Sequence, residues 1–282
     1  MPDSPTIKRR QLSNELRRLR NTAGMTVEQA AERLEWSRAR LGHIETGRRK
    51  KPLITDIKAL LDLYDVTNER EREAIFTLTR QARETGWWTR YDDVFTGRFP
   101  GFEAAASKIG TYEATLIPGL LQTPEYITAI TKATLIYSEE DIQRVVDARL
   151  KRQEILSSPD QPELWAVIDE AALLRLGSGD LMASQVQHLI DVADDTSNSV
   201  TIQVLAIDAG LHAGVDGPFV LLDFDEDASP VVYLETNTDG IYLEEAGEIE
   251  RYRKLFLHIQ VAAMKPERSL AYLKNMLVKR KR

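Results

Sequence analysis

The chain has 282 residues, with 37 Lys+Arg against 44 Asp+Glu, so its formal net charge is −7. Hydrophobic residues make up 43% and charged residues 29%, which is typical of a folded globular protein and excludes a mostly disordered chain. Without cysteines there are no disulfides or thiolate metal sites, and no apolar run is long enough for a membrane span. We therefore expect a cytoplasmic protein of two domains, residues 1–84 and 85–282.

The first two predicted helices are defined by apolar spacing and by residues typical of helix ends. Gly24 ends the first helix, because glycine tolerates the left-handed conformation of a C-terminal cap. Thr26 is the expected N-cap of the second helix, and Gln29 three residues later completes a capping box. The apolar faces of these two helices are Leu12, Leu16, Leu19 and Ala23, then Val27, Ala30, Ala31 and Leu34.

Three more helices are predicted in the first domain. Ser37 is the expected N-cap of the third helix, which runs from 38 to about 45 and is ended by Gly47. Thr55 is the expected cap of the fourth helix, and the fifth spans about 68 to 84. Their inward residues are predicted to be Leu41 and Ile44, then Ile57, Leu60, Leu61 and Tyr64, then Ala74, Ile75, Leu78 and Ala82.

The third helix has the size and the side chains that binding in the DNA major groove requires. Eight residues at ~1.5 Å each give a helix of about 12 Å, which fits a groove about 12 Å wide. Leu41 and Ile44 face the core, so the outer face consists of Arg38, Ala39, Arg40 and His43. Arginine can pair with guanine O6 and N7, and the basic run 48–51 suits phosphate oxygens.

Charge supports this placement, because it is unevenly divided along the chain. Residues 1–83 carry 18 Lys+Arg and 12 Asp+Glu, a net +6, whereas 19 basic and 32 acidic residues give 84–282 a net −13. A positive field over one domain attracts a polyanion even when the whole molecule is negative. The alternatives are a chance difference between two solvated surfaces, or a helical protein-interaction module with a basic face.

The segment LEWSRARLGHIETGRR, residues 34–49, resembles the recognition segment of lambda-repressor-like regulators of the XRE family. The resemblance implies that Ser37 joins the outward residues of the third helix in facing DNA. Two positions depart from the family pattern. Val27 lies near the position where many relatives carry a glutamine that contacts phosphate, although Gln29 is close by. Gly42 stands where the family usually has a serine, and a glycine in a helix interior destabilises the helix by about 1 kcal/mol. The predicted DNA-binding residues are Thr26, Gln29, Ser37, Arg38, Ala39, Arg40, His43, Arg48, Arg49, Lys50 and Lys51.

The second domain is predicted to combine helices with short strands. Helices are expected from 124, over 138–156, 171–176, 181–194 and 248–264, and from 266; strands are expected at 164–169, 200–206, 219–224, 231–235 and 241–244. A hairpin turn is predicted at 237–240. The expected fold class is α+β: an N-terminal all-α five-helix lambda-repressor-like domain, followed by a mixed α+β domain with a short-stranded sheet rather than a doubly wound one.

Five segments of this domain resemble an uncharacterised actinobacterial domain that follows an XRE-type helix–turn–helix in the Scr-like antitoxin-type regulators. They are GWW at 86–88, PGLLQTPEY at 118–126, ARLKRQ at 148–153, DEAAL at 169–173 and VVYLET at 231–236. The resemblance implies DNA binding by the first domain and regulation or partner contact by the second. It also implies a small companion protein, encoded nearby, as a partner.

Catalytic chemistry has few candidates in the second domain. Paired carboxylates at Asp169 and Glu170, or in the run 223–227, could hold a metal or act as acid and base, but capping of a helix and a polar loop explain them more simply. The four histidines lack metal-ligand spacing, although His212 could line a small-molecule pocket. We expect no enzyme activity, no metal and no cofactor.

The sequence thus predicts a DNA-binding transcriptional regulator, a repressor or autoregulator. We expect it to bind double-stranded DNA as a homodimer on an imperfect palindrome, with no membrane partner. The alternative from another class is an antitoxin-type module that sequesters a small partner protein. A metal-dependent enzyme is the less favoured alternative.

Overall fold

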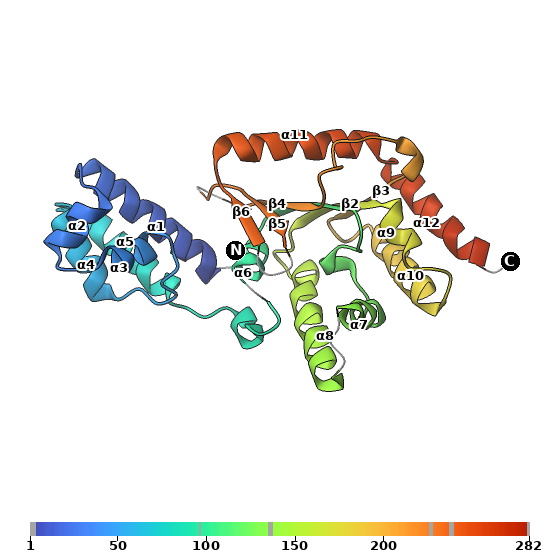
Figure 1. Cartoon of the computed structure of the whole chain (residues 1–282), viewed down its shortest axis with the longest axis horizontal. Coiled ribbons are helices and arrows are strands. Elements are labelled where there is room, and N and C mark those ends of the chain that lie inside the picture. The colour runs from blue at the N-terminus through green and yellow to red at the C-terminus, as the bar shows by residue number, and fades with distance from the viewer. Residues whose placement is uncertain (1–3, 96, 135–137, 226–227, 237–239, 281–282) are drawn as a thin grey trace. The chain divides into compact units, whose positions relative to one another are not determined.

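The structure is a computed structural model, and it describes residues 4–95, 97–134, 138–225, 228–236 and 240–280 (Figure 1). The chain divides into two compact units, Met1–Arg90 and Tyr91–Arg282, which we describe separately. No helix in the described ranges combines the length and the apolar composition that spanning a bilayer demands.

The first unit is the predicted bundle of five helices. Leucine, isoleucine and alanine side chains at the predicted positions form its core, in which Leu16, Leu41, Leu60 and Leu61 are fully buried. Burying such side chains on several helices at once is what makes these short helices stable. The helices are α1 (Pro5–Thr22), α2 (Val27–Arg33), α3 (Arg38–Glu45), α4 (Ile54–Leu63) and α5 (Glu69–Ala82).

Most predicted helix ends of this unit are confirmed, and one is wrong. Gly24 and Gly47 have φ of +65° and +67°, the left-handed conformation expected after α1 and α3. The predicted Thr55 cap is wrong, because α4 begins at Ile54 after an extended Leu53 that makes no side-chain cap. Thr55 lies inside the first turn, where Asp56 supplies the negative charge that a helix N-terminus favours. Ala74, expected in the core, is exposed.

The second unit is built on a six-stranded mixed sheet, which confirms the predicted α+β class. The strand order is β3-β2-β1-β4-β5-β6. The first three strands are parallel, and the remaining three are joined to them and to one another in antiparallel pairs. The strands are β1 (Lys108–Glu113), β2 (Glu163–Asp169), β3 (Val200–Leu205), β4 (Phe219–Asp223), β5 (Val231–Glu235) and β6 (Gly240–Leu243).

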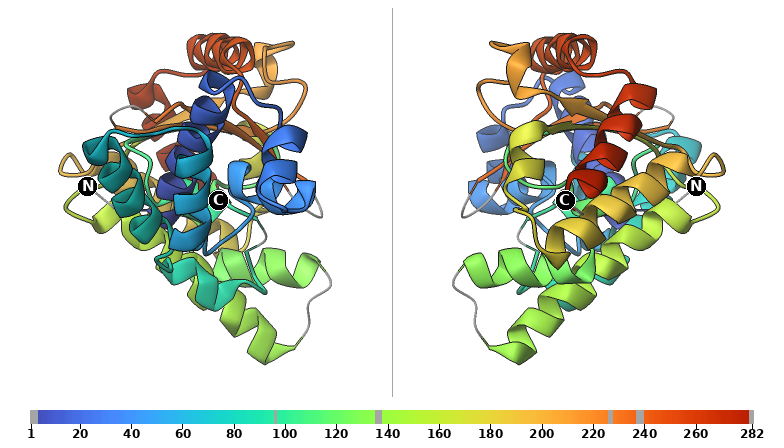
Figure 2. Two further views of the ribbon diagram at one scale, coloured as in Figure 1. Left: turned by 90° about the vertical axis from the view of Figure 1, so that its left-hand side faces the viewer. Right: turned by 90° about the vertical axis from the view of Figure 1, so that its right-hand side faces the viewer.

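Helices cover both faces of this sheet. Helix α11 lies across one face, in contact with β1, β3 and β5, whereas α7, α8 and α10 lie on the other side (Figure 2). Helix α12 packs along β3 and α10. The helices of this unit are α6 (Phe99–Glu103), α7 (Pro124–Ala133), α8 (Glu139–Gln153), α9 (Glu170–Leu174), α10 (Asp180–Asp194), α11 (Ala246–Ala262) and α12 (Pro266–Arg280). The predicted turn at 237–240 lies mostly outside the described residues.

The central strand β1 was not predicted from the sequence. Its residues KIGTYE alternate weakly, and Gly110 lowers the strand signal because glycine has no side chain to pack. The packing requires a glycine at this position, because a Cβ at Gly110 would lie only 2.9 Å from Cε1 of Phe256 on α11. The ring thus packs directly on the backbone of β1, and this contact holds α11 against the sheet.

Adding one methyl group at this contact should loosen the second unit. We expect Gly110→Ala to destabilise it by about 1–3 kcal/mol, because the Phe256 ring must move out of a packed core. Native-state amide hydrogen exchange in β1 and β2 measures the effect. Gly247→Ala is the matched control, since nothing lies within 4 Å of its added Cβ. Equal exchange rates in the two variants would contradict the close packing of Phe256 on β1.

Candidate nucleic-acid interface

Helices α2 and α3 form a tight helix–turn–helix in which both helix starts are capped as predicted. Thr26 Oγ1 accepts a hydrogen bond from Gln29 N at 3.2 Å, and Gln29 Oε1 accepts one from Thr26 N at 2.9 Å. Ser37 Oγ accepts one from Arg40 N at 3.2 Å. The turn between the helices closes through Glu35, whose φ of +55° is unusual for a side chain other than glycine. These caps fix where each helix begins.

The outer face of α3 presents the side chains that sequence analysis assigned to DNA. Leu41 and Ile44 are buried. Exposed on and just before α3 are Ser37, Arg38, Ala39 and His43. Arg38 is 76% exposed and its Nε lies 2.7 Å from Glu28 Oε1 of α2, a surface pair that costs little to exchange for a phosphate or a base.

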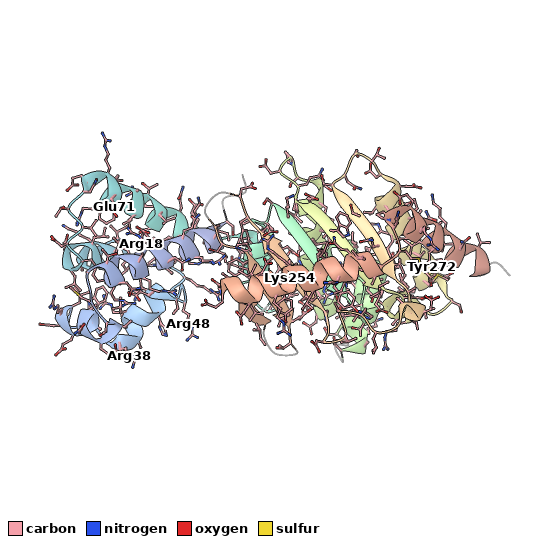
Figure 3. The ribbon with its side chains drawn as sticks, turned by 90° about the horizontal axis from the view of Figure 1, so that it is seen from above. Arg18, Arg38, Arg48, Glu71, Lys254 and Tyr272 are labelled. Atoms are coloured by element: carbon pink, nitrogen blue, oxygen red, sulfur yellow. The ribbon has the colours of Figure 1, made fainter. Side chains whose placement is uncertain are left out.

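The basic turn after α3 continues this surface. Arg48, Lys50 and Lys51 are exposed and Arg49 is partly buried. Arg38 and Arg48 lie on one side of the first unit, with Glu71 on the opposite side (Figure 3). Thr26 and Gln29 are exposed at the start of α2. The predicted residues of α2, α3 and the turn therefore all lie in the first unit. Arg40 and Arg49 differ from the others because both contact Asp56.

Arg40 is engaged within the protein rather than extended from the surface. Its Nη2 lies 2.8 Å from Oδ1 of Asp56, a carboxylate that is only 3% exposed, and its guanidinium stacks 4.1 Å from the ring centroid of Trp36. Arg49 approaches the other oxygen of Asp56 at 3.6 Å. Asp56 was not singled out from the sequence, where it lies in an ordinary first helical turn. It ties α3 and the basic turn to the start of α4.

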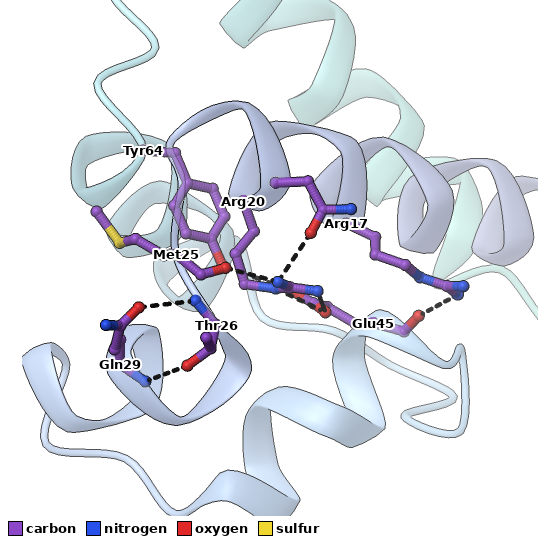
Figure 4. Close-up of polar contacts among 8 residues, drawn as sticks. Arg17, Arg20, Met25, Thr26, Gln29, Glu45 and Tyr64 are labelled. Atoms are coloured by element: carbon purple, nitrogen blue, oxygen red, sulfur yellow. Dashed lines mark hydrogen bonds and ion pairs between the residues drawn. The ribbon is translucent and has the colours of Figure 1, made fainter.

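The orientation of α3 depends on a second buried ion pair, which joins Arg20 of α1 to Glu45 at the end of α3 (Figure 4). Arg20 Nε donates to Glu45 Oε1 at 2.8 Å, and the two side chains are 10% and 4% exposed. Arg20 Nη1 also donates to the Met25 carbonyl at 2.7 Å, directly before α2. Arg17 Nη2 donates to the Glu45 carbonyl at 2.9 Å. One guanidinium thus links α1, the start of α2 and the end of α3.

The fourth helix joins the same network. Tyr64, which follows α4, donates its hydroxyl to Glu45 Oε1 at 3.5 Å. Burial raises the pKa of Tyr64, and the nearby Glu45 carboxylate raises it further. The hydrogen bonds that Arg20 donates to Glu45 raise the pKa of Arg20 as well.

Of the candidate catalytic residues of the second unit, the structure brings His212 close to Asp169 but leaves Asp223 apart from them. Asp169 ends β2 and caps α9, accepting a hydrogen bond from Ala171 N at 2.8 Å. Asp223 pairs in register with Lys108 at the opposite end of β1 and forms an ion pair with Arg253. His212 Nε2 lies 3.9 Å from Asp169 Oδ2. No group of three His, Cys, Asp or Glu side chains in the described part of the chain has a metal-binding arrangement.

Two family models match the chain, one to each unit. Residues 11–75 match a "Helix-turn-helix domain", which supports a DNA-binding regulator of the helix–turn–helix class. Residues 96–275, more than half of the chain, match the "Domain of unknown function (DUF5753)". The chain therefore belongs to the DUF5753 family. No curated protein and no solved structure matches it.

Removing one charge of the Arg20–Glu45 pair should release α3. We expect Glu45→Gln to destabilise the first unit by about 3 kcal/mol, because Arg20 would be left buried without its counter-charge. Amide hydrogen exchange in α3 should then accelerate by about two orders of magnitude. Glu15→Gln, which breaks the exposed Arg18–Glu15 pair of α1, should leave it nearly unchanged. Similar exchange in both variants would show that the pair does not hold α3.

The coupling of Arg40 to Asp56 can be measured by a double-mutant cycle. Arg40→Ala should cost about 1–2 kcal/mol in the wild type, because it leaves a buried carboxylate with only the more distant Arg49. In an Asp56→Asn background, the same substitution should cost clearly less. Amide exchange in α3 and α4 is again the measurement. Equal costs in both backgrounds would mean that the two side chains act independently.

Proposed function

We propose that the protein is a sequence-specific transcriptional regulator that inserts α3 into the major groove of double-stranded DNA. One observation carries the proposal: α3 is held at both ends by ion pairs with a buried carboxylate, while Arg38, Ala39 and His43 stay exposed on its outer face. A helix held in place with exposed polar side chains meets the requirement for direct contact with base edges. Arg48 and Lys51, exposed in the turn that follows, supply phosphate contacts that set the position of the helix.

Within this proposal Arg40 and Arg38 have different roles. Arg40 is a positioning residue because it contacts Asp56 and Trp36. Since 39% of its side chain is exposed, the contact of Arg40 with a base stays a prediction. Arg38 is the better base-reading arginine, because only an exposed surface pair has to break before it reaches guanine.

The finer parts of the proposal concern assembly and regulation. We propose a homodimer, since helix–turn–helix modules related by a two-fold axis contact half-sites about 34–36 Å apart. We further propose a cytoplasmic repressor or autoregulator of the Scr-like antitoxin type, with a small companion protein as partner of the second unit. The exposed apolar side chains of that unit support a protein partner, and they include Leu174, Ile207, Leu211 and Val215.

The proposal predicts a specific defect for Arg38→Ala. We expect a loss of about 1–3 kcal/mol in binding to the selected site, and relaxed preference at one base-pair position, because a bidentate contact with guanine is lost. Sites selected from a random duplex pool by wild type and variant, followed by titration at fixed salt, provide the measurement.

Two controls make that result interpretable. Lys51→Ala should weaken binding to all sequences alike and reduce the salt dependence by about one charge, as expected for a phosphate contact. Arg18→Ala, an exposed arginine of α1 that pairs with Glu15 and Glu71, should change neither affinity nor preference. Unchanged base preference in Arg38→Ala, or a defect equal to that of Arg18→Ala, would contradict the proposed DNA-facing surface.

A further inference from the structure

Two arginines of the first unit approach the same buried carboxylate, that of Asp56 in the first turn of α4. Arg40 of α3 donates from Nη2 to Asp56 Oδ1 at 2.8 Å, whereas Nη2 of Arg49 lies 3.6 Å from Oδ2. The arginine side chains are 39% and 33% exposed, so both reach the carboxylate from the surface. One buried acid thus has two cations within reach, and only one of them forms a hydrogen bond with it.

The hydrogen bonding of this cluster is incomplete. Among the residues that the structure describes, the buried side-chain nitrogen and oxygen atoms without a hydrogen-bond partner are Arg40 Nε and Asp56 Oδ2. Both atoms belong to the same ion pair, which has one hydrogen bond where a guanidinium and a carboxylate can form two. A buried polar atom without a partner destabilises a protein, and native structures contain few of them. The carboxylate therefore gains if a second donor moves onto its Oδ2.

Arg49 is placed to become that donor. Its backbone N donates to the His43 carbonyl of α3 at 3.0 Å, which fixes the point from which its side chain extends. An approach of about 0.6 Å would bring its Nη2 within ordinary hydrogen-bond distance of Asp56 Oδ2. Because Arg49 has the same guanidinium as Arg40, it can neutralise Asp56 in place of Arg40.

Arg40 is the member of the cluster that can extend toward DNA. It lies on α3 directly after the exposed Ala39, and its guanidinium lies 4.1 Å from the ring centroid of Trp36, which is only partly buried. Separating an arginine from a buried carboxylate costs much more than giving up a partly exposed stacking contact. The loss of Asp56 is therefore the main obstacle to a contact between Arg40 and a base.

A guanine edge can replace the hydrogen bond that Arg40 gives up. In the major groove guanine presents two acceptors, O6 and N7, and an arginine binds both at once. Adenine presents one acceptor beside a donor, thymine one acceptor, and cytosine a donor. Guanine is therefore the base for which leaving Asp56 is most favourable to Arg40.

We infer that DNA binding transfers Asp56 from Arg40 to Arg49: Arg40 extends to a guanine, and Arg49 closes on the carboxylate. The exchange keeps the buried charge of Asp56 paired in the free protein and in the complex. Arg49 is thus a positioning residue that determines the preference for guanine by acting through Asp56. The inference rests on the proposed insertion of α3 into the major groove.

The test measures a guanine preference in the full chain. This preference is the ratio of the affinities for the selected duplex and for the same duplex with one G·C pair replaced by A·T, at fixed salt. The G·C pair is the one at which Arg40→Ala lowers the preference, by about tenfold. Arg49→Ala should lower it about fivefold, because Arg40 can then leave only by stranding a buried carboxylate. Arg48→Ala removes an exposed arginine of the same turn, and should weaken binding to both duplexes alike.

Asp56→Asn distinguishes the exchange from an arrangement in which Arg40 stays on Asp56 while it contacts the base. An amide needs no counter-charge, so under the exchange the variant should keep or increase the guanine preference. Adding Arg49→Ala to it should then have no further effect on the preference. If Asp56 instead holds Arg40 against the base, Asp56→Asn should lower the preference. Amide hydrogen exchange in α3 and α4 verifies that the variant is folded, and the comparison of Arg48 with Arg49 does not require it.

The outcomes separate this inference from the proposed function. The inference is overturned, with DNA binding by α3 intact, if no G·C pair responds to Arg40→Ala or if Arg49→Ala leaves the guanine preference unchanged. An equal loss of preference in Arg48→Ala, or a loss in folded Asp56→Asn, overturns it as well. If wild type selects no duplex from the random pool, the proposed function fails and the inference fails with it.

Discussion

The buried ion pair between Arg20 and Glu45 is the interaction on which the proposed DNA-facing geometry of the first unit depends. Removing two charges from water costs several kcal/mol per ion, so such a pair is tolerated only when its remaining donors are bound. Here they are bound by the Met25 carbonyl and by Asn21 Oδ1, at 2.7 and 2.9 Å. Because these partners come from α1, the start of α2 and the end of α3, the pair permits one arrangement of the three helices.

A second buried carboxylate, that of Asp56, holds the opposite end of α3. Asp56 holds Arg40 at the start of α3 and attracts Arg49 in the turn beyond it, so both ends of a helix of eight residues are anchored by charge. The side chains that remain exposed are the ones that we propose to contact DNA. The net charge of −7 conceals an uneven distribution, because the first 83 residues carry +6 and the remaining residues carry −13.

Local features of the fold were predictable from the sequence, and long-range ones were not. Thr26 with Gln29, and Ser37, act within three residues, so their caps follow from spacing alone. Arg20 and Glu45 are 25 positions apart, and no periodicity connects an arginine of one helix to a glutamate of another. The strand β1 was missed because Gly110 has no side chain, and only the ring of Phe256, far along the chain, explains the glycine. Arg40 was predicted to face outward, but the sequence gives no sign that Asp56 and Trp36 engage it.

The most direct test of the central claim is a crosslink from the proposed DNA-facing surface. A photoreactive benzoylphenylalanine in place of Ala39, an exposed position of α3, should crosslink to bases in the major groove of the bound site. The same residue in place of Glu73, an exposed position of α5, should not crosslink to bases. Crosslinks from position 73 with none from position 39 would contradict the assignment of α3 as the helix that enters the groove.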